Sequence, residues 1–155
     1  MISPELLRRY PFFGVFNDAQ LKEIAMIAEE EIFESGQSVF QEGQPANFVY
    51  LLQAGGIDLF QTVAEEKPSG EQKEFLLGEI NPGELFGISS VIEPYRYTTS
   101  ARTTVQSRAI VIDATALRAL FEKDLRLAYL CMQQIAKTAL ERLNATRVQL
   151  AAAWA

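Results

Sequence analysis

Residues 35–60 read SGQSVFQEGQPANFVYLLQAGGIDLF, a series of short apolar runs separated by glycines. The runs at 38–40, 48–52 and 57–63 are rich in β-branched and aromatic residues, which favour strands. Glycine or proline stands in each connection between them, where the chain has to turn. Short strands with turns this frequent predict a sandwich or a closed roll.

The same pattern continues on both sides of this stretch. Further β-rich runs lie at 31–33, 74–80, 98–104 and 108–113, and the turn NPGE separates two of them. Pro82-Gly83 in that turn suits a type II turn, in which glycine supplies the positive φ. The β-rich part is therefore expected to span residues 31–113.

Helical patterns precede the strands. Residues 3–9 predict a short helix with proline in its first turn. Residues 17–30 predict a clearer one, because Asn17 can cap it and Gln20 has the spacing of a capping box. We expect residues 1–30 to form a helical layer.

Helical patterns also follow the strands. Asp113 can cap a helix starting at 114, and Asp124 can cap a long helix running to about residue 153. The predicted fold class is α+β: an antiparallel β-roll (a double-stranded jelly roll) flanked by N-terminal helices and a long C-terminal helix. The chain is interpreted as a single domain, with parts at 1–30, 31–113 and 114–155.

Composition narrows the classes of protein. Hydrophobic residues make up 48% and charged residues 22%, as in a soluble globular protein. No apolar run approaches the roughly 20 residues that span a bilayer, and the N-terminus does not resemble a signal peptide. A single cysteine, Cys131, precludes an internal disulfide, so we expect a cytoplasmic protein.

The chain contains no histidine, which removes histidine-based catalysis and histidine-ligated metals. One cysteine also cannot form a thiolate metal cluster. The formal net charge of −6 has the wrong sign for a protein whose main partner is a phosphate backbone. We therefore expect neither an enzyme, nor a metal cofactor, nor a membrane protein.

The glycine spacing of residues 35–60 resembles the first motif of the cyclic-nucleotide-binding domain family, which includes catabolite-activator-type regulators, cyclic-nucleotide-gated channels and kinase regulatory subunits. The positions that carry the resemblance are Gly36, Val39, Phe40, Glu42, Gly43, Ala46, Val49, Tyr50, Leu51, Leu52 and Gly55. The similarity extends over nearly the whole chain, from 12 to 150. It implies a regulatory β-roll whose C-terminal helix responds to a ligand.

The resemblance also identifies residues 83–104, GELFGISSVIEPYRYTTSARTT, as the family's phosphate-binding segment, here called the cassette. In the family, backbone N–H groups and an arginine bind the cyclic phosphate, and a glutamate accepts the ribose hydroxyl. Here Ile88 stands at the glutamate position and Tyr97 at the arginine position. The candidate ligand-binding residues are Phe86, Gly87, Ile88, Ser89, Ser90, Arg96, Tyr97, Thr98 and Thr99.

The two departures predict weak or absent cyclic-nucleotide binding in the family's usual mode. Ile88 cannot accept a hydrogen bond, and an unpaired buried hydroxyl costs roughly 1–3 kcal/mol, or about 10–150-fold in affinity. Losing the arginine should cost more, because a buried anion loses its counter-charge. The alternative is that Ile88 only extends the core into a vestigial pocket.

Three groups of side chains could compensate for these losses. Arg96 lies one residue before the expected arginine, and Arg102 is a second candidate if the gap is longer. The alternative for Arg96 is a surface side chain near Glu93, since a one-residue slip in a strand changes the face. The serine and threonine hydroxyls could hold a small anion, although capping and β-propensity explain them equally well.

The family's long helix closes over the purine and forms the dimer. By that resemblance Arg142 and Thr146 are candidate lid residues, with a solvated helical arginine as the alternative for Arg142. The apolar stripe Met132, Ile135, Ala139 and Leu143 fits either a homodimer or packing on the roll.

Two functional hypotheses remain. The first is a sensor that binds a nucleotide (cyclic AMP or cyclic GMP) or a small anion in a modified cassette and signals through the C-terminal helix. The second is a ligand-free roll that serves for dimerisation or protein docking. The related cupin enzymes bind metal largely through histidine, which this chain lacks. Direct DNA binding is not expected, because no helix-turn-helix follows the long helix, and the protein partner is not identified.

Overall fold

The computed structural model describes residues 1–64, 70 and 72–155. Its N-terminal layer comprises α1 (Pro4–Arg8), the 3-10 helix η1 (Pro11–Val15) and α2 (Asp18–Met26). The predicted capping box is confirmed: Gln20 N–H donates to the Asn17 side chain at 2.9 Å, and Gln20 Oε1 accepts from Asn17 N–H at 3.0 Å.

The strands begin earlier than the sequence pattern suggested. Strand β1 (Ala28–Phe33) starts three residues before the expected boundary at residue 31. Along its whole length it pairs with the last strand of the roll, from Ala28 opposite Ile112 to Phe33 opposite Ser107. This long-range pairing overrides the helical periodicity of the local sequence.

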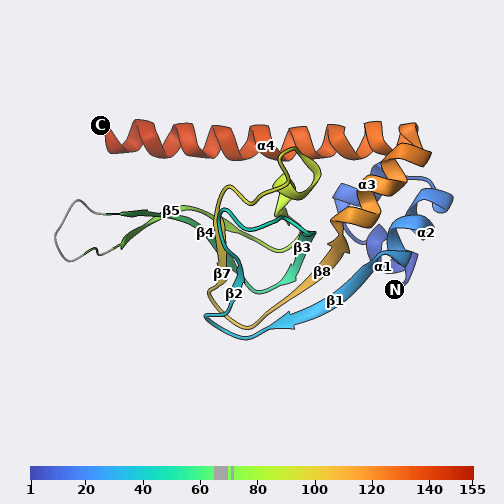
Figure 1. The fold of residues 1–155 in the computed structure, drawn as a ribbon, viewed down its shortest axis with the longest axis horizontal. Helices are drawn as coiled ribbons and strands as arrows, with labels where there is room; N and C mark the ends of the chain where they lie inside the picture. The colour runs from blue at the N-terminus through green and yellow to red at the C-terminus, as the bar shows by residue number, and fades with distance from the viewer. Residues whose placement is uncertain (65–69, 71) are drawn as a thin grey trace.

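Two four-stranded sheets form the roll, and every strand pair in them is antiparallel, as predicted. The first sheet has the order β1-β8-β3-β6 and the second the order β2-β7-β4-β5 (Figure 1). The remaining strands are β2 (Ser38–Phe40), β3 (Phe48–Ala54), β4 (Ile57–Ala64), β5 (Gln72–Ile80), β6 (Leu85–Phe86), β7 (Ser100–Thr103) and β8 (Ser107–Asp113).

Strand β3 is buried on both faces and separates two hydrophobic cores. Val49 and Leu51 belong to the core between the first sheet and the helices. Tyr50 and Leu52, which point the other way, belong to the core between the two sheets. The near-continuous apolar run at 48–52 is thus explained by burial on both sides.

The turn at the start of the cassette has the predicted conformation at its glycine. Gly83 has a φ of +89°, and its N–H donates to the Leu52 carbonyl at 2.7 Å. This bond ties the start of the cassette to β3.

Two capped helices complete the chain: α3 (Ala114–Lys123) and α4 (Leu125–Ala153). The carboxylates of Asp113 and Asp124 accept from backbone N–H groups of Ala116 and Leu127, each at 3.0 Å, which confirms both predicted caps. Helix α4 lies across the roll above the cassette and continues past strands β4 and β5 (Figure 1).

The two halves of α4 differ in burial. The buried residues Leu127, Cys131 and Ile135 all lie in the first half. The second half carries large exposed side chains: Leu140, Leu143, Val148, Leu150 and Trp154. The apolar stripe of the sequence therefore packs on the protein's own core only in its first turns.

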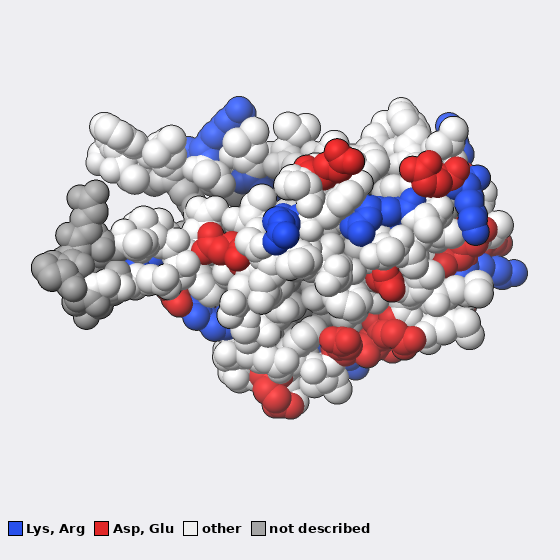
Figure 2. Space-filling view, viewed as in Figure 1, with Lys and Arg blue, Asp and Glu red and all other residues white. Residues whose placement is uncertain are grey.

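Charge is mixed on the face shown in Figure 2, where acidic and basic side chains alternate over the roll and α4. Among the helices of the described residues, none is both long and apolar enough to cross a bilayer.

Candidate functional site

The cassette contains a second backbone turn, at Gly87, that only glycine fits well. Gly87 follows β6 with a φ of +72° and precedes the short 3-10 helix η2 (Ile88–Val91). A Cβ at this position would lie 3.0 Å from Tyr50 Cδ2 and 3.2 Å from the Phe48 carbonyl oxygen. The Ser90 hydroxyl donates to the Gly87 carbonyl at 2.7 Å, which fixes the turn from the other side.

Tyr97, at the position of the family's arginine, is part of the core. Its ring stacks on Phe40 with centroids 3.8 Å apart and planes 10° from parallel. Its hydroxyl donates to the Phe48 carbonyl at 2.8 Å and accepts from the Phe48 N–H at 3.3 Å. Burial raises the pKa of Tyr97, so the side chain stays neutral. Tyr97 therefore contributes a neutral aromatic ring to the site and supplies no charge to a ligand.

The two arginines considered as replacements both lie elsewhere. Arg96 is exposed, and its Nη1 donates to the Gly43 carbonyl at 2.7 Å. Arg102 forms a bidentate ion pair with Glu74, with N–O distances of 2.7 and 3.1 Å. Its guanidinium lies over the Phe60 ring of the second sheet. Neither arginine lines the two cavities that face α4; Arg102 lines a separate cavity of about 470 Å³ together with its partner Glu74.

A small cavity of about 210 Å³ lies between the cassette and α4. Six of the nine candidate ligand-binding residues line it: Gly87, Ile88, Ser89, Tyr97, Thr98 and Thr99. Ser89 Oγ lies 3.5 Å from Thr98 Oγ1, so two hydroxyls meet at its wall. Of the other three candidates, Phe86 and Ser90 are fully buried behind the wall, and Arg96 is outside.

A larger cavity of about 500 Å³ continues along α4. Leu59 of β4 and Leu77 and Ile80 of β5 provide much of its apolar wall. The candidate lid residues Arg142 and Thr146 line it from α4. Its volume falls in the range of sites for small ligands, about 300–1,000 Å³.

Arg142 lines both cavities, together with Leu59 and Thr99. Its Nε and Nη2 atoms are buried and have no hydrogen-bond partner. Burial lowers the pKa of the Arg142 guanidinium, while the charges of Glu84 and Glu141 raise it. Arginine nevertheless stays protonated in proteins. A charged guanidinium therefore lies in the cavity wall with two nitrogens that donate no hydrogen bond.

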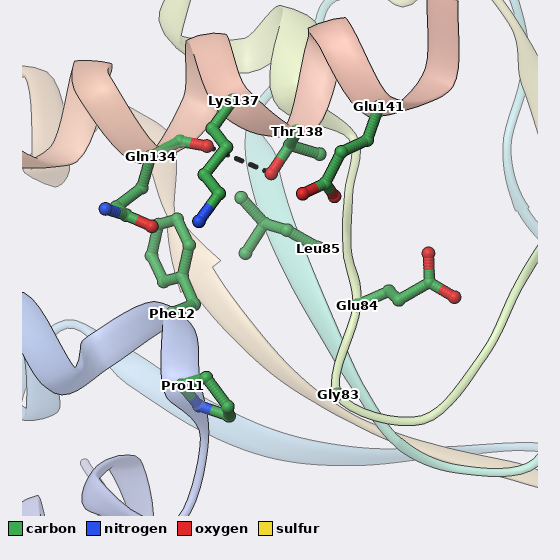
Figure 3. A pocket seen from close by; sticks show the side chains of 9 residues that line it. All are labelled: Pro11, Phe12, Gly83, Glu84, Leu85, Gln134, Lys137, Thr138 and Glu141. Atoms are coloured by element: carbon green, nitrogen blue, oxygen red, sulfur yellow. Dashed lines mark hydrogen bonds between the residues drawn. The ribbon is translucent and has the colours of Figure 1, made fainter. Parts of the chain in front are cut away.

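The two carboxylates that act on Arg142 line the larger cavity with it, and they also line an adjoining third cavity, shown in Figure 3. Glu84 lies in the turn before β6 and accepts from the Asn81 N–H at 3.0 Å. Glu141 is exposed on α4, and the neighbouring Thr138 hydroxyl is bonded to the Gln134 carbonyl at 3.0 Å (Figure 3). Among the described ion pairs, none joins either carboxylate to Arg142.

Sequence reasoning missed Arg118 of α3. Its guanidinium donates to the Ser90 carbonyl and lies 4.1 Å from the centroid of the Tyr95 ring. The cassette is thereby attached to α3, directly before α4. No local pattern in the sequence indicates this contact, because it joins residues 28 apart.

Within residues 1–64, 70 and 72–155, no group of three His, Cys, Asp or Glu side chains comes together as a set of metal ligands.

Comparison with protein families gives one match. Residues 30–124, which include both glycine motifs, match the cyclic nucleotide-binding domain.

Two similar proteins support this match. The chain is 40% identical to a candidate cyclic nucleotide-binding protein of known crystal structure from Geobacter metallireducens GS-15, covering 92% of this chain and 99% of that one with a TM-score of 0.81. It is 31% identical over 108 residues to a CRP-like cAMP-activated global transcriptional regulator of Mycobacterium tuberculosis, covering 68% of this chain and 46% of the regulator. The match thus spans less than half of that relative.

The catabolite activator protein of Thermus thermophilus has the same fold at 20% identity. Its TM-score is 0.65, and the alignment covers 90% of this chain and 61% of that chain.

Proposed function

Because the chain belongs to the cyclic nucleotide-binding domain family, we propose that it is a non-enzymatic sensor that binds a small anionic ligand between the cassette and α4. The observation that supports this most is the pair of adjoining cavities, which share Leu59, Thr99 and Arg142. Cyclic AMP and cyclic GMP are the first ligands to test, since the relative from Mycobacterium tuberculosis is described as cAMP-activated.

The signal is proposed to leave the site through α4. This helix supplies one wall of both cavities, and over the same stretch and beyond it carries exposed side chains that do not line them: Leu140, Leu143, Val148, Leu150 and Trp154. A ligand that prefers one position of the helix shifts its population, and these exposed side chains move with it.

Titration calorimetry with cyclic AMP and cyclic GMP tests the proposal. Because Ile88 and Tyr97 replace the family's ribose and phosphate contacts, we expect binding in the upper micromolar to millimolar range, roughly −4 to −6 kcal/mol. Absence of heat at millimolar nucleotide, with the fold verified by circular dichroism, removes cyclic nucleotides as ligands and leaves other small anions.

The exposed half of α4 favours a second role, which is compatible with the first. We propose that it forms a homodimer with the same segment of a second copy, because an apolar helical stripe of this length is stabilised when a partner covers it. A protein that dimerises but binds no nucleotide or small anion would be a docking module only.

A further inference from the structure

We propose that Arg142 of α4, and not an arginine of the roll, binds the anionic group of the ligand. The inference rests on the proposed function, and it specifies the ligand class: a small molecule with one phosphate or carboxylate beside a flat apolar body.

The first step concerns the state of Arg142. Two of its three guanidinium nitrogens are buried without a partner. A buried charge without a partner is unfavourable, and an arginine cannot lose its proton to relieve this. An anion in the cavity would provide the missing acceptors. Carboxylate and phosphate groups both offer two oxygens that can accept a bidentate pair of hydrogen bonds from the planar guanidinium.

The second step concerns the other cations. Arg96 is bonded to Gly43, and Arg102 is paired with Glu74 in a separate cavity, so neither lines the two cavities that Arg142 lines. Among the residues lining the cavity beside the cassette, Arg142 is the one that carries a charge. The hydroxyls of Ser89 and Thr98 face the same space and can donate further hydrogen bonds to an anion.

The third step concerns neutralisation by the protein itself. Glu84 is bonded to the turn at Asn81, and Glu141 is exposed to solvent beside α4. Both also line the larger cavity with Arg142, and their charges raise the pKa of its guanidinium. Among the described residues, no ion pair joins either carboxylate to Arg142, and no carboxylate lines the smaller cavity, so the anionic group of the ligand is expected there.

The last step concerns the body of the ligand. Leu59, Leu77 and Ile80 line the larger cavity, and Ile88 lines the smaller one. At position 88 an aliphatic side chain cannot accept from a ribose hydroxyl. The site therefore distinguishes charge from neutrality but does not distinguish a ribose from a deoxyribose.

The test uses calorimetry on four proteins: wild type, Arg142→Gln, Arg142→Lys, and Arg126→Gln as a control. Arg126 is an exposed arginine near the start of the same helix, away from the cavities. The probes are benzyl phosphate and neutral benzyl alcohol, and cyclic AMP with its 2′-deoxy analogue. Circular dichroism verifies that each variant is folded.

We expect Arg142→Gln to weaken benzyl phosphate binding by about 10- to 100-fold, because a charge-assisted contact is lost. Arg142→Lys should recover part of the loss, and Arg126→Gln should bind as wild type does. Benzyl alcohol should bind weakly and equally to all four. Cyclic AMP and its 2′-deoxy analogue should differ by less than about threefold where they bind.

Two results would overturn the inference, and they separate it from the proposed function. If the anions bind Arg142→Gln as tightly as wild type, a group other than Arg142 binds the charge of the ligand, and the proposed sensor role stands. If no probe binds the folded wild type, the anion-binding function and this inference both fail.

Discussion

Gly87 lies where β6 ends and η2 begins, with a positive φ and close neighbours on the side where a Cβ would project. Two independent constraints therefore act on one residue: the backbone conformation and the contact with Tyr50 and the Phe48 carbonyl. The position of the cassette beside α4 depends on both.

Gly87→Ala is expected to lower the free energy of unfolding by about 2–4 kcal/mol, since strain in the left-handed region adds to a clash with a backbone oxygen. Urea unfolding measures the change. Gly14→Ala is the matched control, because Gly14 lacks a positive φ and a Cβ there meets nothing within 4 Å. An equal effect of both substitutions would contradict the argument.

The residue types of the cassette could be identified from the sequence, but their orientations could not. Ile88 and Tyr97 were recognisable as departures from the family motif. That Tyr97 packs under Phe40 and that Arg96 points outwards depends on the strand register and on partners 40 to 60 positions away. The unpaired nitrogens of Arg142 likewise follow from packing, which a helical pattern does not reveal.

Among the elements, α4 combines two environments in one helix. Its first half is fixed by Leu127, Cys131 and Ile135 in the core, and its second half presents apolar side chains to solvent. The cap at Asp124 holds the N-terminal end, while nothing among the described residues buries Trp154.

Leu143→Lys is expected to convert the proposed homodimer to a monomer, because four dispersed apolar side chains cannot hold an interface into which a lysine charge is introduced. Sedimentation at about 10–200 μM protein measures the association. Leu125→Lys, an exposed leucine at the other end of α4, is the control. A wild type that is monomeric throughout this range would contradict the homodimer.

The helices and turns were predictable because their signals are local. Asn17 with Gln20, Asp113 and Asp124 all cap as expected, and Gly83 has the positive φ of its turn. The start of β1 was placed too late, because it is set by pairing with a strand about 80 residues away.

At the scale of the whole molecule, two cores share β3 as a common wall, and the helical core contains Cys131. Burial raises the pKa of this thiol to about 12. An unfolded thiol, with a pKa near 9, loses its proton first as the pH rises. The unfolded state therefore binds fewer protons above pH 9, and the protein loses stability with increasing pH.

Between pH 8 and pH 10 this thiol is expected to remove roughly 1 kcal/mol from the free energy of unfolding, at about 1.4 kcal/mol per unit once the unfolded thiol is ionised. Urea unfolding of wild type and Cys131→Ala at both pH values measures the difference. Cys131→Ala should be less stable at pH 8 because it leaves a cavity, but its loss on raising the pH should be smaller. Identical losses would show that the thiol ionises equally in both states.

Helix α4 is one continuous helix in which the residues that line the cavities alternate along the chain with the residues of the exposed apolar stripe. Thermodynamic reciprocity then applies to anything bound at the two places. If a ligand at Arg142 strengthens the contact of the stripe with a partner tenfold, that partner strengthens ligand binding tenfold in return. If that partner is a second copy of the chain, the ligand affinity measured in solution consequently depends on the protein concentration as well as on the cavity.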